Sequence, residues 1–363
     1  MNRLTAIGLA SLVAYGLLIA SKYTGFVAAA REDKASQTSL SDQAAMRAMV
    51  GGFRSDASQT RLGDLPPPLI RNEPMRLSPA ALEFRTARDL KAFADDLNGR
   101  RADLNGDERY NLARALEECQ FATSINEDLA SFSAKQRRQF LASLTPGDPN
   151  TAKRIAAYDA SDNTQRCQRF QGTKISQKDV EDLYNSAAQQ GDPRAQARLL
   201  VADMNAKISA GNRTESAQAT AQPATPRSPI GDDASRVIGL LETQDPEAMM
   251  IVGNFLSQSN VATTLHIGPA GEVPEPSALL GAFSLAACDM TADCTQLNRD
   301  PQLACAYSGY CDSQSFEELY QNFLASPWAY AQAVRYRNFI HTAINTQNWT
   351  LLGLVPTNTP DGQ

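Results

Sequence analysis

The chain has 363 residues, 42% of them hydrophobic and 20% charged, a composition typical of folded proteins with a sizeable core. Forty acidic against 34 basic residues give a net charge of −6, which argues against a broad electrostatic contact with nucleic acid or anionic lipid, because both need a basic surface. The two histidines, His266 and His341, leave little material for metal centres or imidazole-based catalysis.

The N-terminal segment, residues 1–30, has the three parts of a secretory signal. Arg3 precedes an apolar run at 4–20, and an alanine-rich stretch ends at Ala30. The run is also about long enough to cross a bilayer as a helix, so an uncleaved membrane anchor is the alternative. Both interpretations place the remaining chain outside the cytoplasm. We expect an exported, periplasmic protein, either anchored in the inner membrane or soluble after signal cleavage.

A polar spacer is expected at 31–75, because this stretch is rich in Ser, Gln and Asp and contains a run of three prolines at 66–68. A helical domain should follow at 76–208. Its first helix begins at Ser78 and Pro79, an N-cap residue followed by proline at the first helical position.

Apolar residues at three- and four-residue steps continue this helical pattern. Leu90, Phe93 and Leu97 repeat in this way before Gly99 ends the helix. Asp107 is expected to cap the next helix. The acidic run around Asp107 begins like a calcium loop, but it has neither the glycine at the sixth position nor the glutamate at the twelfth that such a loop needs. A turn with a helix cap therefore accounts for it better.

Residues 179–204 read as two helices joined by a tight turn. Val180 and Leu183 begin the apolar stripe of the first helix, and Gly191 allows the left-handed conformation that ends it. Asp192 then caps the second helix and Pro193 opens it. Its stripe is expected to contain Ala195, Leu199 and Met204.

A disordered linker or loop is predicted at 209–233, which holds almost no large apolar residues. A second helical domain is expected at 234–355 and a short tail at 356–363. Within this second domain, residues 237–256 repeat the hairpin pattern loosely, with Gln244 standing where the first copy has glycine.

The turn at 187–196 resembles that of a Sel1-like repeat, a relative of the tetratricopeptide helical hairpin. The copies lie farther apart than the regular period of about 34 residues, which favours an irregular α-solenoid over a long array. The resemblance implies an all-α fold of helical hairpins and a binding scaffold rather than a catalyst. An ordinary antiparallel helical hairpin is the alternative. One isolated strand is predicted at 261–267, too little to form a sheet.

Six cysteines in an exported chain predict disulfides. Cys119 and Cys167 stand apart and are expected to pair. The other four should form two bridges, for which three connectivities remain open. Their spacings are wider than those of structural zinc sites, which favours disulfides over a metal. The clustered cysteines are Cys288, Cys294, Cys305 and Cys311.

The C-terminal helical part, around 305–344, resembles exported proteins of Gram-negative bacteria that have no assigned activity. Its residues Trp328, Tyr330, Arg335 and Arg337 form a candidate ligand surface for an anionic or glycan ligand. A solvated basic edge beside core aromatics is the alternative.

No sequence motif of a hydrolase elbow, a nucleotide-binding loop or a zinc protease occurs, and we predict no catalytic, cofactor-binding or metal-binding residues. The first functional hypothesis is a non-catalytic periplasmic helical-repeat protein that binds an envelope protein or peptide. An envelope-directed hydrolase with an unrecognised site is the second, and His266 or His341 would be its test positions. A purely structural envelope component is the third.

Overall fold

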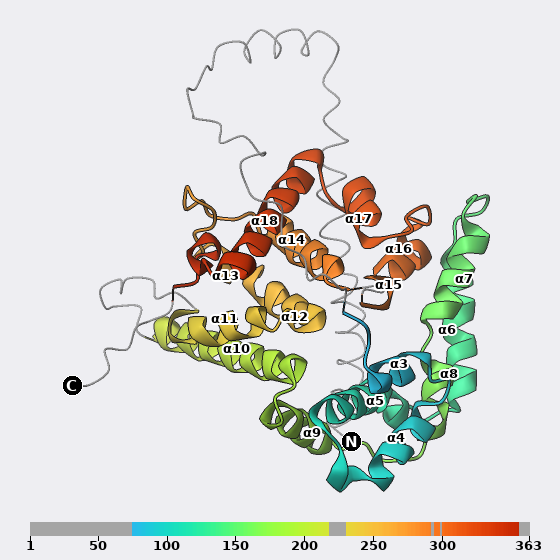
Figure 1. The fold of residues 1–363 in the computed structure, drawn as a ribbon. Coiled ribbons are helices and arrows are strands. Elements are labelled where there is room, and N and C mark those ends of the chain that lie inside the picture. The colour runs from blue at the N-terminus through green and yellow to red at the C-terminus, as the bar shows by residue number, and fades with distance from the viewer. Residues whose placement is uncertain (1–74, 218–229, 292–293, 298–299, 356–363) are drawn as a thin grey trace, which may run out of the picture.

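The computed structural model of the chain describes residues 75–217, 230–291, 294–297 and 300–355 (Figure 1). These residues form helices joined by short turns, and the fold class is all-α as predicted. No strand occurs in the described ranges, where two isolated β-bridges pair Met75 with Thr291 and Ile267 with Glu272. None of their helices is long and apolar enough to span a membrane. The predicted signal or anchor at 1–30, nearly all of the spacer and the tail at 356–363 lie outside the described residues.

Most helices from the first half of the chain surround one hydrophobic core, whereas α7 belongs to a separate small cluster. Their bounds are α3 (Pro79–Thr86), α4 (Leu90–Gly99), η2 (Arg101–Asp103), α5 (Gly106–Ser124), α6 (Leu129–Ser143), α7 (Thr151–Ser161), α8 (Thr164–Cys167), η3 (Gln168–Phe170), α9 (Gln177–Gln189) and α10 (Pro193–Ala217).

The helices of the second half build another core, in which α14 packs along α18 and α12. Their bounds are η4 (Gly231–Asp233), α11 (Ala234–Glu242), α12 (Pro246–Leu256), α13 (Ser259–Ala262), α14 (Pro276–Asp289), α15 (Cys294–Leu297), α16 (Asp300–Ser308), α17 (Phe316–Leu319), η5 (Tyr320–Leu324), α18 (Pro327–Thr346) and η6 (Trp349–Leu352).

The two cores meet along α10. Ala195, in its first turn, belongs to the core of the first half, whereas Ala197, Leu200 and Met204 belong to the other. Leu200 and not Leu199 carries the buried stripe of this helix, which corrects the predicted register. Residues 218–229 of the predicted linker lie outside the described residues, and its two ends belong to α10 and η4.

Helix starts follow the predicted capping chemistry at most positions. The Ser78 hydroxyl accepts the Ala81 amide at 3.0 Å, and Asp192 accepts the Ala195 amide at 3.0 Å. The prediction for Asp107 was wrong, because Asn105 caps α5 instead. The backbone amide of Asn105 donates to Glu108 at 2.9 Å and its side chain accepts the Glu108 amide at the same distance, a reciprocal capping box.

Two further expectations fail for local reasons. The helix expected to run from Pro79 to Gly99 is broken, because Asp89 accepts the amides of Lys91 and Ala92 and starts a new helix there. The strand predicted at 261–267 is wrong. Its first residues complete the short helix α13, and only Ile267 forms a β-bridge.

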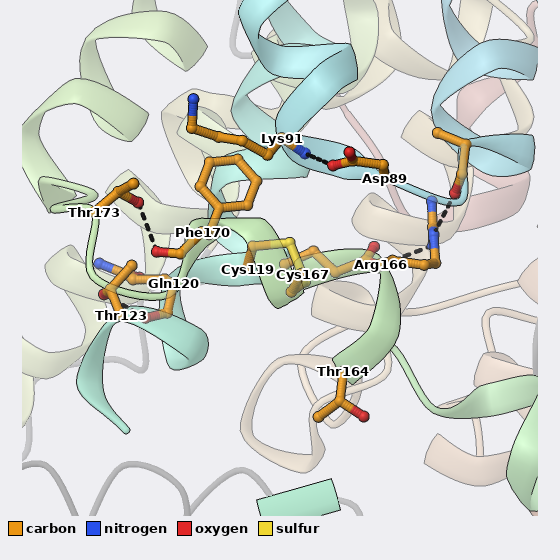
Figure 2. The surroundings of a disulfide bond; sticks show 12 residues. Asp89, Lys91, Cys119, Gln120, Thr123, Thr164, Arg166, Cys167, Phe170 and Thr173 are labelled. Atoms are coloured by element: carbon orange, nitrogen blue, oxygen red, sulfur yellow. Dashed lines mark hydrogen bonds and ion pairs between the residues drawn. A yellow bond between two sulfur atoms is a disulfide. The ribbon is translucent and has the colours of Figure 1, made fainter. Parts of the chain in front are cut away.

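Three disulfides confirm the predicted bonding of all six cysteines. In the C-terminal cluster, each cysteine is bonded to the one nearest to it in the sequence. Cys119 of α5 is bonded to Cys167 of α8, and Figure 2 shows this bond between Phe170 and Arg166. Disulfides of this kind form in oxidising compartments outside the cytosol. The two other pairs are Cys288–Cys294 and Cys305–Cys311.

The Cys119–Cys167 bond closes a loop of 48 residues inside the first core, whereas Cys288–Cys294 spans only six. Because a longer loop loses more entropy in the unfolded chain, Cys119→Ala/Cys167→Ala should lower the free energy of unfolding by about 2–5 kcal/mol. Urea denaturation under oxidising conditions measures this. The matched variant Cys288→Ala/Cys294→Ala should lose less, and an equal or larger loss there would contradict the explanation.

Candidate functional site

A cavity of about 680 Å³ lies where four helices begin. The first turns of α3, α5, α10 and α12 form its wall, and we call it the helix-start cavity. Met75 and Thr291 also line the cavity and form a β-bridge, beside which the Met75 amide donates to the Met290 carbonyl at 2.9 Å. Because α5 belongs to the first core, α12 to the second and α10 to both, this cavity lies at the junction of the two cores.

At these helix starts, most of the backbone N–H groups are either absent, because the residue is proline, or already bonded to a cap side chain. Proline at the first position of α3, α10 and α12 has no N–H to offer a ligand. Ser78, Asp192 and Asp245 accept the amides of the residues that follow. The cavity therefore presents carboxylate and hydroxyl oxygens rather than the free amides that bind an anion at a helix start.

Arg194 organises the carboxylates on one side of the helix-start cavity. It is 8% exposed, and its guanidinium donates to Asp107 and to Asp192, each at 2.6 Å. The same guanidinium stacks 4.2 Å from the ring centroid of Tyr110. Asp107 does not cap α5; it pairs with Arg194 and thereby joins α10 to α5.

Glu247 occupies the centre of a second group. It accepts the Tyr110 hydroxyl at 2.9 Å and forms an ion pair with Arg114. Burial by itself raises the pKa of Glu247, but the charges of Arg114 and Arg194 outweigh burial, so the pKa lies below its ordinary value. Glu247 is therefore held as a carboxylate that joins α12 to α5.

Asp245 differs from the other carboxylates of the cavity. Its side chain accepts the Ala248 amide at 2.8 Å, and no ion pair with it is found among the described residues. Burial raises its pKa, and this effect outweighs the Ala248 hydrogen bond and the charge of Arg194, both of which lower it. One carboxylate oxygen of Asp245 has no protein hydrogen-bond donor in the described ranges and is available to a ligand.

The predicted ligand surface on α18 does not form a single pocket. Trp328 is 59% exposed, while Arg335 pairs with Glu272 elsewhere along the helix. The other two residues do come together, because the Tyr330 hydroxyl donates to Glu317 at 3.0 Å and Arg337 lies 3.3 Å from the same carboxylate. The Tyr330 hydroxyl and the Arg337 guanidinium are thus engaged by neighbouring protein groups, whereas Arg335 is bound through Nη2 and its buried Nε has no hydrogen-bond partner among the described residues.

The two histidines lie in different surroundings. His341 is buried, with Nε2 2.7 Å from Asp289, and Arg337 donates to the same carboxylate at 2.6 Å. His266 is exposed, with Nδ1 3.1 Å from the Gly271 carbonyl. In the part of the chain that the structure describes, no group of three or more His, Cys, Asp or Glu side chains is arranged to hold a metal ion.

Several helix caps of this site could be predicted from the sequence, but their convergence on one cavity could not. The caps Ser78, Asp192 and Asp245 follow from the pattern of a polar residue before proline. That pattern gives no information on whether different helix starts face one another. Tyr110, Arg114 and Glu247 have no recognisable motif, and only the fold brings them together.

Removing the charge of Glu247 should be costly, because it leaves half-buried Arg114 without its partner. Glu247→Gln is expected to lower the free energy of unfolding by about 2 kcal/mol, measured by urea denaturation. Asp182→Asn breaks an exposed ion pair with Lys178 and serves as the control, with no measurable change expected. Equal effects of the two substitutions would contradict the assigned role of Glu247.

The Asp289 cluster predicts a pH dependence. Burial raises the pKa of Asp289, but His341 and Arg337 outweigh it, so the folded-state pKa lies below the ordinary 3.8. Its stabilisation is therefore complete above that ordinary value and is lost as the pH falls through the folded-state pKa. Asp289→Asn should cost about 2 kcal/mol at pH 7, and less near pH 3. A deficit that stays constant in denaturation curves between these pH values would contradict this.

No protein-family model, no curated protein and no solved structure matches the chain.

Proposed function

We propose that the protein is a non-catalytic binding protein of the cell envelope that holds a peptide or a segment of another protein in the helix-start cavity. The observation that carries this proposal is the cavity itself, whose volume of about 680 Å³ lies in the range of ligand sites. The three disulfides support an exported, oxidising environment, and a periplasmic location is part of the proposal.

The chemistry of the cavity wall suits a peptide. Pro79, Pro193 and Pro246 supply apolar contact, while Asp245 supplies an acceptor for a backbone N–H or a cationic side chain. Exposed Arg76 also lines the cavity and can donate to a peptide carbonyl or carboxylate. The Sel1-like resemblance of the turn that contributes Asp192 and Pro193 favours the same binding role.

A hydrolase of envelope material is the second candidate, because Asp245 and Glu247 have pKa values shifted in opposite directions within one cavity. Glu247, however, is already engaged by Tyr110 and Arg114, which leaves it poorly placed to act as a base or nucleophile. The binding role is therefore favoured. Turnover of envelope material that Asp245→Asn abolishes would support the hydrolase instead.

Site-specific photo-cross-linking in cells that carry the native gene tests the binding role. Gln190 lines the cavity and is exposed, whereas Gln139 is an equally exposed glutamine on α6, which does not contribute to the cavity. A photoreactive residue at Gln190 should give a discrete cross-linked product that is absent when it replaces Gln139. The same product from both positions, or none from Gln190, would overturn the proposal.

Asp245→Asn should reduce the yield of the Gln190 cross-link about tenfold, because a neutral amide holds a cationic or N–H donor less strongly than a carboxylate. Asp182→Asn on the outer face of α9 is the control and should leave the yield unchanged. Asparagine also caps helices well, so α12 should keep its start. An unchanged yield with Asp245→Asn would remove this carboxylate from the binding site.

A further inference from the structure

The hairpin of α6 and α7 is rooted in the first core by Leu129 and Phe132 at the start of α6, while the rest of it lies outside both main cores and α7 packs against α16 (Figure 1). A separate small cluster connects them, in which Phe140 and Tyr158 stack at 4.1 Å beside buried Ala306 of α16. The edge of the Tyr307 ring covers both aromatic rings. Because α7 packs more extensively on α16 than on any other described helix, the hairpin depends on α16 for much of its tertiary contact.

The polar contacts between α7 and this part of the chain converge on one turn. Arg154 donates from Nε to the Ala306 carbonyl at 3.0 Å and from Nη2 to the Tyr307 carbonyl at 3.2 Å. Asn150 donates to the Gly309 carbonyl at 3.2 Å. These three carbonyls belong to the end of α16 and the turn that follows it. Beyond the turn, Lys153 of α7 forms an ion pair with Asp312 at 2.8 Å.

The Cys305–Cys311 disulfide encloses that turn. Ala306, Tyr307 and Gly309, the residues whose carbonyls the hairpin contacts, all lie between the two cysteines. Gly309 has a φ of +79°, a conformation that glycine adopts without steric penalty. The carbonyls that Arg154 and Asn150 contact thus lie in a loop closed by a covalent bond.

The disulfides differ in their access to solvent. Cys119 and Cys167 are each 0% exposed inside the first core, whereas Cys311, in the turn after α16, is partly exposed, as are Cys288 and Cys294. Thiol–disulfide exchange requires that a thiolate reach one of the sulfur atoms. A reductant can therefore attack the Cys305–Cys311 bond in the folded protein, while the Cys119–Cys167 bond is protected by burial.

We propose that the Cys305–Cys311 disulfide is a redox latch that holds the α6–α7 hairpin against α16. A dithiol, such as that of a thiol–disulfide oxidoreductase, attacks Sγ of Cys311 and forms a mixed disulfide, while Cys305 leaves as a thiolate and takes up a proton. The second thiol of the reductant then displaces Cys311, so the dithiol is oxidised by two electrons and two cysteine thiols form. The relaxed turn no longer presents its carbonyls to Arg154, and the hairpin is released. This latch is independent of the proposed binding function.

The full chain is treated with increasing dithiothreitol, its free thiols are alkylated, and the modified cysteines are identified by peptide mapping. Cys305 and Cys311 should be alkylated while Cys119 and Cys167 remain bonded. Under those conditions, amide hydrogen exchange across 129–161 should accelerate about tenfold, because the hairpin loses its docking surface. Cys305→Ser/Cys311→Ser should show the fast exchange without reductant, and Cys288→Ser/Cys294→Ser should not.

Arg154→Met gives an independent readout, because it removes two contacts with the turn and leaves the disulfide intact. It should accelerate exchange in the hairpin under oxidising conditions. Reduction of Cys305–Cys311 no earlier than Cys119–Cys167 would overturn the latch. Unchanged amide hydrogen exchange across 129–161 after alkylation of Cys305 and Cys311 would also overturn the latch. This measurement uses the wild-type chain and does not depend on the folding of a cysteine variant.

Discussion

The structure depends on a set of buried and half-buried charges where its two hydrophobic cores meet. Tyr110 and Arg114 of α5 contact Glu247 of α12, and Arg194 of α10 reaches Asp107 of α5. A buried charge is tolerated only when it is paired and hydrogen-bonded, so each of these contacts requires the others to be in place. The helices that carry them are therefore held in one relative arrangement, and their first turns enclose the helix-start cavity.

This arrangement explains why the cavity persists instead of collapsing. Its wall consists of capped helix starts, in which proline and a polar cap fix the backbone locally. Behind the wall, the guanidinium groups are anchored on aromatic rings, as Arg194 is on Tyr110. A preformed cavity of this kind favours binding, because little conformational entropy remains to be lost when a ligand enters. Asp245 differs from Asp107, Asp192 and Glu247 of the wall in forming no direct ion pair within the described ranges.

The sequence predicts local features well and contacts between distant segments poorly. The cap at Ser78, the turn at Gly191 and the cysteine content were all predictable, because each depends on a few neighbouring residues. Asp107 shows the limit of that reasoning. It has the right residue type for a cap, but Asn105 takes that role and Asp107 pairs with Arg194, far away in sequence. Long-range contacts of this kind assemble the wall of the cavity, and no local sequence pattern predicts them. The resemblance to Sel1-like repeats stays a prediction.

Equilibrium unfolding followed by two probes tests most directly whether the buried charges join both cores. Trp328 and Trp349 are the two tryptophans and both belong to the second half, so tryptophan fluorescence reports the second core, whereas far-UV circular dichroism reports helices from both. If the network at the cavity makes the cores one cooperative unit, the two curves in urea should coincide. Two separate transitions in the wild-type chain would show that the cores unfold independently, and would contradict the account.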